Sequence, residues 1–229
     1  MPGKSHPLCV AIDGPSASGK STVARAVAAR IGATYVDSGS WYRGMTWAAL
    51  RCGAEVRVPS EVLAVMRRTR WQMQVRAGAG VYSIDGVEPG VALRSEPVRE
   101  SVSDVAAIPE VRAFIVDRLR ETTQYGDIVM EGRDIGTVVF PDTPYKFYLD
   151  ADPEERARRR LKDIVSLEGL GDVETVRQSL QRRDMKDRTR TTAPLQIAPE
   201  ARILDSTALS VEEVVTIILA ALPRRENRL

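Results

Sequence analysis

The feature that most constrains the fold is a glycine-rich segment, Gly14-Pro15-Ser16-Ala17-Ser18-Gly19-Lys20-Ser21, which matches the pattern G-x-x-x-x-G-K-[ST] in full. Before it, residues 8–12 form a short apolar run of the kind found in strands buried on both faces of a parallel sheet. From Lys20 onward, apolar and small residues recur at helical spacing as far as Gly32, where a C-cap glycine is expected. The segment therefore predicts a strand, a loop whose backbone N–H groups cradle phosphates, and a helix.

The motif assigns roles within this phosphate loop. Lys20 is expected to reach the β- and γ-phosphates of ATP, and Ser21, or its neighbour Thr22, to hold Mg²⁺ directly or through water. The chain has no Asn-Lys-x-Asp guanine motif and is short for a motor ATPase, which favours a kinase of small metabolites. The expected ATP-binding residues are Gly14, Pro15, Ser16, Ala17, Ser18, Gly19, Lys20, Ser21 and Thr22.

The rest of the chain alternates short apolar runs with helical patterns. With residues 8–12, the strands predict an α/β fold with a doubly wound, five-stranded parallel sheet and helices on both faces. The last helix begins at a capping box of Ser210 and Glu213. The other strands are expected at 34–37, 128–130, 146–149 and 202–204, and the other helices at 38–52, 59–69, 95–107 and 109–124.

One stretch departs from this alternation. Residues 71–75 alternate apolar and polar side chains, and a second strand is expected at 81–84 after the turn Gly78-Ala79-Gly80. Asp85-Gly86 then indicates another tight turn. The stretch from about 70 to 95 is therefore predicted to be a small antiparallel insertion or subdomain.

Composition excludes several classes of function. The only histidine, His6, precedes the first strand, so mechanisms that need a histidine base or ligand are disfavoured. Cys9 and Cys52 lack metal-site spacing and are expected to be reduced, buried thiols. A net charge of +2 with interspersed signs argues against a nucleic-acid surface, and no apolar run is long enough for a membrane. Without a signal-peptide or coiled-coil pattern, a cytoplasmic monomer is expected.

Basic side chains follow two of the predicted strands. Residues 37–43 and 131–134 both begin at the carboxyl edge of the sheet, where open α/β folds bind ligands. Either segment alone is explained by a helix N-cap and a surface arginine. Together they indicate a second phosphate site.

A helical stripe further along the chain begins apolar and becomes charged. It is predicted to pack inward at its apolar end and to direct its charges into a cleft, although Arg183 and Asp187 would alternatively form an exposed i,i+4 pair. Arg156, Arg159 and Arg160 lie on an earlier helix and are expected to face phosphates or solvent. The stripe consists of Val173, Val176, Leu180, Arg183, Asp187 and Arg190.

These segments together resemble the bacterial cytidylate kinases, a family of nucleoside monophosphate kinases. The resemblance runs from about Leu8 to Leu222. It implies one domain (1–229), with a core at about 8–58, 125–151 and 191–222, a nucleoside monophosphate-binding insertion at about 59–124 and a lid at about 152–190. The motifs that carry it are Asp13-Gly14-Pro15 with the phosphate loop, Asp37-Ser38-Gly39-x-x-Tyr42-Arg43, Gly132 to Asp142, and Arg183-Asp184 through Ala193-Pro194-Leu195.

The resemblance also implies the reaction and its residues. ATP with Mg²⁺ would donate its γ-phosphoryl group to CMP or dCMP. Within the acceptor site, Ser103, Arg112 and Asp134 would read cytosine, and Arg183 with Asp187 would contact the sugar. The implied CMP-binding residues are Ser38, Tyr42, Arg43, Ser103, Arg112, Arg133, Asp134, Arg183, Asp187 and Arg190, and the implied catalytic residues are Lys20, Arg133, Arg156, Arg159 and Arg190.

Two residues depart from the family pattern, and other functions stay open. Glu131 stands where aspartate is common, and Trp41, where an aliphatic residue is usual, is expected to line the acceptor pocket or pack behind it. The alternatives are a kinase that acts on UMP, AMP or a non-nucleotide acceptor, a nucleotide-dependent regulator, and an enzyme that modifies nucleic acid.

Overall fold

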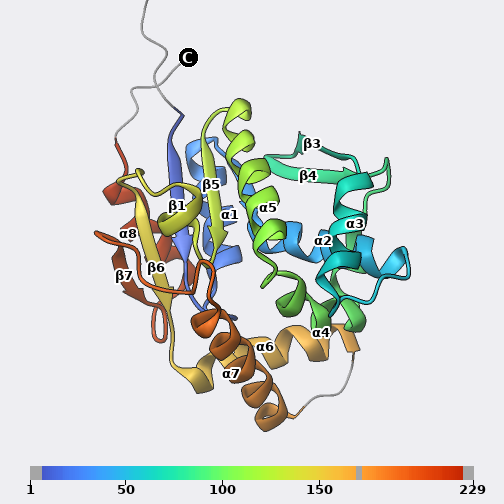
Figure 1. Cartoon of the computed structure of the whole chain (residues 1–229). Helices are drawn as coiled ribbons and strands as arrows, with labels where there is room; N and C mark the ends of the chain where they lie inside the picture. The colour runs from blue at the N-terminus through green and yellow to red at the C-terminus, as the bar shows by residue number, and fades with distance from the viewer. Residues whose placement is uncertain (1–6, 169–171, 224–229) are drawn as a thin grey trace, which may run out of the picture.

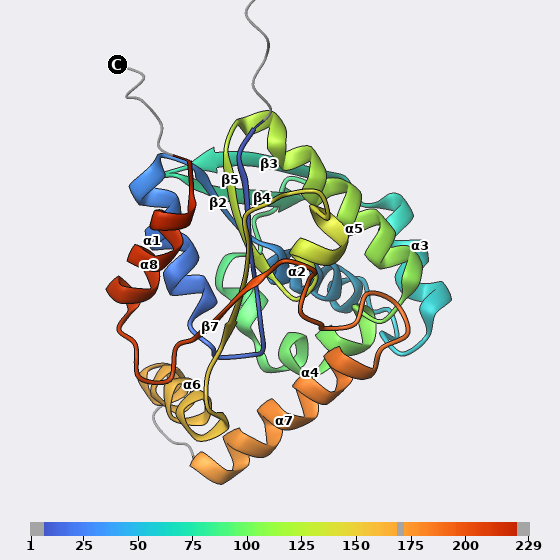
Figure 2. The ribbon, with the colours of Figure 1, turned by 90° about the vertical axis from the view of Figure 1, so that its left-hand side faces the viewer.

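Five parallel strands form the centre of the sheet in the computed structural model, which describes residues 7–168 and 172–223, without the side chains of 163–168. β1 (Cys9–Asp13) lies between β5 (Ile128–Gly132) and β6 (Lys146–Asp150). β7 (Arg202–Asp205) lies beyond β6 (Figure 1), and β2 (Thr34–Asp37), which is labelled in Figure 2, lies beyond β5. The order β2-β5-β1-β6-β7 confirms the predicted doubly wound parallel arrangement.

The hairpin of β3 (Trp71–Arg76) and β4 (Ala79–Ile84) corrects one part of the prediction. It is continuous with the main sheet, which therefore has seven strands rather than five. The turn falls at Ala77 and Gly78, which both have positive φ, and not at Gly78-Ala79-Gly80. Because β4 begins two residues earlier than expected, Ala79 pairs with Tyr35 of β2, and the Tyr35 N–H donates to the Gly78 carbonyl at 2.9 Å.

Helices cover both faces of the sheet, as expected (Figure 2). One face carries α1 (Lys20–Ile31) and α8 (Val211–Ala221), and the predicted capping box of Ser210 and Glu213 begins α8. Beyond the carboxyl ends of the strands lie α6 (Pro153–Glu168) and α7 (Val173–Thr189). The other face carries α2 (Ser38–Arg51), α3 (Pro59–Arg68), α4 (Glu96–Val105) and α5 (Pro109–Glu121), with short turns η1 (Gly90–Arg94), η2 (Thr122–Tyr125) and η3 (Ile135–Val139).

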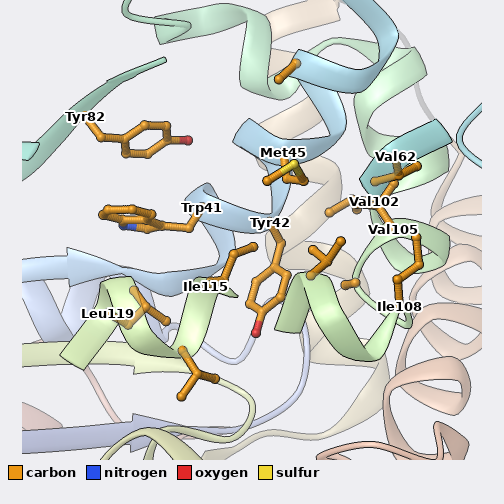
Figure 3. Close-up of a cluster of buried hydrophobic side chains, with 14 of the residues drawn as sticks. Trp41, Tyr42, Met45, Val62, Tyr82, Val102, Val105, Ile108, Ile115 and Leu119 are labelled. Carbon is orange, nitrogen blue, oxygen red and sulfur yellow. The ribbon is translucent and has the colours of Figure 1, made fainter. Parts of the chain in front are cut away.

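The core consists of one apolar layer on each side of the sheet. In β5, Met130 contributes to the layer under α2–α5, and Val129 to the layer under α1 and α8. Every residue of β5 is buried, which explains why its first three residues, 128–130, are all apolar instead of alternating with polar ones. Figure 3 shows part of the first layer, where Met45 lies among side chains of α2, α3, α4 and α5.

An aromatic stack fastens the hairpin to α2. The ring centroid of Trp41 lies 5.4 Å from that of Trp71 and 5.0 Å from that of Tyr82. Trp41 is 4% exposed, and Figure 3 shows that it leaves α2 in a different direction from Tyr42. Of the two expectations for Trp41, the structure therefore supports packing behind the acceptor region, against the hairpin.

The cysteine prediction is wrong for Cys52, which is exposed, while Cys9 is half-buried. Cys52 is the C-cap of α2, directly before Gly53, so it lies where the chain leaves the helix at the surface. None of the helices among the described residues is long and apolar enough to cross a membrane.

The core under α2 gives a stability test. Met45 is fully buried, so Met45→Ala should lower the free energy of unfolding by about 2–5 kcal/mol through lost packing and a residual cavity. Met185→Ala is the matched control, because that side chain is 62% exposed on α7 and should change stability by less than about 0.5 kcal/mol. Urea denaturation measures both. Equal losses in the two variants would contradict the burial described.

Candidate active site

The phosphate loop is shaped by glycine where side chains cannot fit. Gly14 has a φ of 148°, and a Cβ there would lie 2.0 Å from the Leu149 carbonyl oxygen of β6. Gly19, with a φ of 89°, is the N-cap of α1. The loop curls around Lys20, whose Nζ donates to the Pro15 carbonyl at 2.5 Å and to Ser18 Oγ at 3.3 Å.

The ammonium of Lys20 is held in an environment that disfavours its charge. Burial and the nearby Arg133 lower the pKa of Lys20 to about 7, although Glu131 and Asp184 oppose the shift. A polyanion placed in the loop would reverse this balance, because it would supply the negative charge that the buried amine lacks. Lys20 is therefore suited to bind phosphate, as expected from the motif.

Glu131 sits at the end of β5, beside the start of α1. Its Oε1 accepts from the Ser21 hydroxyl and, at 3.1 Å, from the Tyr35 hydroxyl. The Glu131 carbonyl accepts from Ser38 Oγ at 2.7 Å. A hydroxyl next to a carboxylate is an all-oxygen donor set of the kind Mg²⁺ prefers, so Ser21 and Glu131 fit a Mg²⁺ ion that also binds ATP phosphates. The hydrogen bond from Tyr35 helps to hold the Glu131 side chain in this position.

Asp13 ties the end of β1 to the segment after β5. Its Oδ1 accepts from the Ile135 N–H at 2.9 Å and its Oδ2 from the Gly136 N–H at 2.8 Å. Burial raises the pKa of Asp13 to about 6, against the opposing effect of these two N–H groups. The turn after β5 is thereby fixed, which sets the positions of Arg133 and Asp134.

A buried ion pair lies beneath the expected acceptor site. Arg112 of α5 donates to Asp134 Oδ2 and, at 3.1 Å, to the Ala106 carbonyl at the end of α4. The Arg112 guanidinium also lies 5.0 Å from the centre of the Tyr42 ring. Ser103, the third residue expected to read cytosine, is half-buried on α4, three residues before Ala106.

Further arginines lie close to the Arg112–Asp134 pair. Arg190 Nη2 lies 3.8 Å from Asp134 Oδ1, and Arg190 Nη1 lies 3.5 Å from Asp187 Oδ1. Arg133 Nε donates to the other Asp187 oxygen at 3.0 Å. Asp187 therefore joins two arginines and is not half of an exposed pair with Arg183.

Two more arginines complete the cluster. Arg43 Nη2 donates to Asp37 Oδ2 at 2.6 Å. Burial lowers the pKa of Arg183 to about 10, and the positive charges of Arg133, Arg43 and Arg160 act in the same direction. An excess of positive charge at this point fits a site that receives an anion.

Unsatisfied polar atoms mark the same region. Among the described residues, the buried side-chain atoms without a hydrogen-bond partner are Tyr42 Oη, Arg43 Nε, Arg112 Nε, Arg190 Nη2 and Thr137 Oγ1. Four of these five atoms belong to residues that the resemblance assigns to the acceptor site. Since buried polar groups normally have partners, the cluster indicates a place for a polar ligand.

The helices α6 and α7 also contact the phosphate loop. Of the predicted α7 stripe, Val176 and Leu180 are buried against Ala157 of α6, whereas Val173 is 40% exposed. Arg156 Nη1 donates to the Ser16 carbonyl at 3.1 Å. Arg159 donates to Ser206, whose own hydroxyl donates to the Ser18 carbonyl at 3.0 Å.

Sequence reasoning missed three residues that shape this site. Tyr35 binds Glu131, Ser206 contacts the phosphate loop, and Asp184 accepts from the Ser16 N–H at 3.1 Å. The only sequence signal for Asp184 was its place in the Arg183-Asp184 motif. Tyr35 and Ser206 lie at or beyond strands far away in the chain, and no local pattern links them to the loop.

Comparison with known proteins agrees with this geometry. A family model described as cytidylate kinase matches residues 10–224. The chain belongs to the cytidylate kinase family. Members of this family are ATP-dependent nucleoside monophosphate kinases. A cytidylate kinase of Geobacillus kaustophilus is 40% identical over 95% of this chain and 97% of its own length. A cytidylate kinase of Mycobacterium leprae is 40% identical over 96% of this chain and 97% of its own.

A solved structure of an uncharacterized protein from Eubacterium ventriosum is similar in fold. Its TM-score is 0.51 at 12% identity, over 93% of this chain and 97% of that one. At that identity the likeness concerns the fold alone.

The lowered pKa of Lys20 predicts proton uptake when ATP binds. At pH 8 a Lys20 with a pKa of about 7 is mostly neutral, and the phosphates of ATP should raise that pKa and protonate it. Calorimetry of Mg·ATP binding in buffers of different ionisation enthalpy should show this uptake. The uptake should be smaller at pH 6, where Lys20 is already protonated, and absent in Lys20→Met. Equal uptake by wild type and Lys20→Met would assign the proton to another group.

Proposed function

We propose that this enzyme transfers the γ-phosphoryl group of Mg·ATP to CMP or dCMP, giving ADP and CDP or dCDP. The observation that carries the proposal is the buried Arg112–Asp134 pair beside polar atoms of Tyr42, Arg43 and Arg190 that lack hydrogen-bond partners. This region lies at the carboxyl edge of the sheet, next to the phosphate loop. The bound CMP or dCMP would supply hydrogen-bond partners for these atoms.

The donor side consists of the phosphate loop and its surroundings. Residues Gly14 to Thr22 bind the phosphates of ATP, with Lys20 on the β- and γ-phosphates and Ser21 at the Mg²⁺ site beside Glu131. The metal, when bound, neutralises charge on the phosphate oxygens. Arg156 and Arg159 lie against the loop and add positive charge there. Both belong to the region 152–190, which we propose acts as a lid over the core of residues 8–58, 125–151 and 191–222.

The acceptor phosphate would lie among the arginines that follow β2 and β5. Arg43, Arg133 and Arg190 carry the positive charge, with Ser38 and Tyr42 beside them. Arg133 also donates to Ser16 Oγ of the phosphate loop at 2.8 Å, so it lies between the donor and acceptor sites. Its guanidinium is therefore placed to neutralise charge on the group being transferred.

The base and sugar would be bound by the insertion at 59–124, by the segment after β5 and by α7. Asp134 offers an acceptor for the cytosine amino group, and Arg112 with Ser103 offers donors for the ring carbonyl and nitrogen. Uracil carries a carbonyl where cytosine has its amino group, so the Asp134 carboxylate would repel it. Arg183 and Asp187 would contact the sugar.

No general base is needed for this reaction. The attacking oxygen belongs to a phosphate that is already ionised at neutral pH, so catalysis consists of alignment and charge neutralisation. This is consistent with a chain whose only histidine is His6. Closure of α6 and α7 would exclude water, which competes as an acceptor. That the enzyme acts as a cytoplasmic monomer, on free nucleotides and not on nucleic acid, stays a prediction from the sequence.

The direct test is ADP formation from Mg·ATP with CMP, dCMP, UMP, AMP and GMP offered one at a time. CMP and dCMP should support rapid turnover, while AMP and GMP give little more than the control without acceptor. Preference for another acceptor would retain the kinase chemistry and overturn the cytosine assignment. If none of the five acceptors supports turnover above the control, a nucleotide-dependent regulator is favoured instead.

Asp134→Asn tests how cytosine is recognised. An amide at this position can donate to the uracil carbonyl, so the ratio of kcat/KM for UMP to that for CMP should rise by at least about tenfold. Asp117→Asn is the control, because Asp117 makes an exposed ion pair on α5 and should leave the ratio unchanged. An unchanged ratio in Asp134→Asn would remove Asp134 from base recognition.

A further inference from the structure

Ser16 of the phosphate loop is held by the lid helices through both of its backbone polar groups. Its N–H donates to Asp184 Oδ1 of α7 at 3.1 Å, and its carbonyl accepts from Arg156 Nη1 of α6 at 3.1 Å. The same Arg156 nitrogen donates to Asp184 Oδ2 at 2.5 Å. A closed ring of three contacts therefore joins α6, α7 and the loop.

The next residue needs such a restraint. Ala17 has a φ of 59°, in the left-handed region that a residue with a side chain rarely adopts. Its methyl group packs against the small apolar cluster of Ala157, Val176 and Leu180 between α6 and α7. The backbone contacts of Ser16 and the apolar contacts of Ala17 thus come from α6 and α7, while the Ser16 side chain accepts from Arg133.

The ion pair itself is not explained by stability. Arg156 and Asp184 have only 9% of each side chain exposed, and burying two charges costs about as much as their attraction returns. Arg156 Nε also donates to the Ala151 carbonyl just after β6, so its guanidinium is anchored at three points. A pair that is costly to bury, and that contacts a ligand-binding loop at its backbone, indicates a positioning role.

We propose that Asp184 is a positioning residue for ATP, which acts with Arg156 to hold the Ser16-Ala17 turn in the form that binds phosphates. ATP affinity then depends on the docking of α6 and α7, and by reciprocity bound ATP favours that docking. The inference rests on the proposed function only in taking ATP as the ligand of this loop. It does not depend on which acceptor is used.

The test measures binding of Mg·ATP alone, by calorimetry without acceptor, to wild type and Asp184→Asn. The amide keeps the size of the side chain but has no charge and only one acceptor oxygen, so it cannot bind both the Ser16 N–H and Arg156. The dissociation constant for ATP should therefore rise by about tenfold. CMP affinity, measured in the same way, should not change. Unchanged ATP affinity would overturn the proposal. Tighter ATP binding would overturn it too, because it would mean that the carboxylate competes with phosphate.

Two further variants separate positioning from general effects. Glu174→Gln removes one carboxylate from the same helix, in an exposed pair with Arg177, and should bind ATP as wild type does. Asp184→Asn combined with Arg156→Met leaves no unpaired buried charge, so it should fold even if the single variant does not. This double variant should still bind ATP weakly. Recovery of wild-type affinity would show that the two charges only neutralise each other, and would refute the positioning role.

The outcome is independent of the proposed function. A wild-type protein that binds Mg·ATP but phosphorylates no nucleoside monophosphate would refute the proposed reaction and leave this comparison valid. Conversely, a wild-type protein that phosphorylates CMP, with Asp184→Asn binding ATP normally, would refute only the role of Asp184.

Discussion

The arrangement of the site depends on the hydrogen bonds between Asp13 and the segment after β5. This carboxylate is 3% exposed and accepts from two consecutive backbone N–H groups, those of Ile135 and Gly136. Parallel pairing of β1 with β5 brings Asp13 level with Gly132, so the phosphate loop and Arg133-Asp134 begin at the same height of the sheet. The Asp13 contacts and the pairing of β1 with β5 together fix the position of the donor site relative to the acceptor site.

The electrostatic design follows from that geometry. The predicted acceptor site gathers Arg43, Arg112, Arg133 and Arg190, and Asp37, Asp134 and Asp187 neutralise their charge only in part. The carboxylates hold the guanidinium groups in place but do not satisfy all of their nitrogens. Arg190 Nη2, for example, lacks a hydrogen-bond partner. Two anionic substrates would supply the negative charge that the site lacks. Burial, together with the same lack of negative charge, lowers the pKa of Lys20. Catalysis without a general base is consistent with such a site.

Local patterns predicted the elements well, and non-local contacts explain the failures. The phosphate loop, β2 and the caps of α1 and α8 are each determined by neighbouring residues, so the sequence was sufficient. The union of the hairpin with the sheet rests on one pair, Tyr35 with Ala79, which no periodicity encodes. Asp184 was missed because it lies one residue, or about 100° around the helix, from the predicted stripe of α7, so it faces the phosphate loop and not the acceptor arginines. The roles of the individual site residues stay predictions.

The most direct test is a crystal structure of the enzyme with ADP, Mg²⁺ and CMP. We expect the cytosine ring of CMP against Arg112 and Asp134, the CMP phosphate among Arg43, Arg133 and Arg190, and the diphosphate of ADP in the loop of residues 14–22. A cytosine ring bound away from Asp134, or a CMP phosphate that contacts none of these arginines, would contradict it.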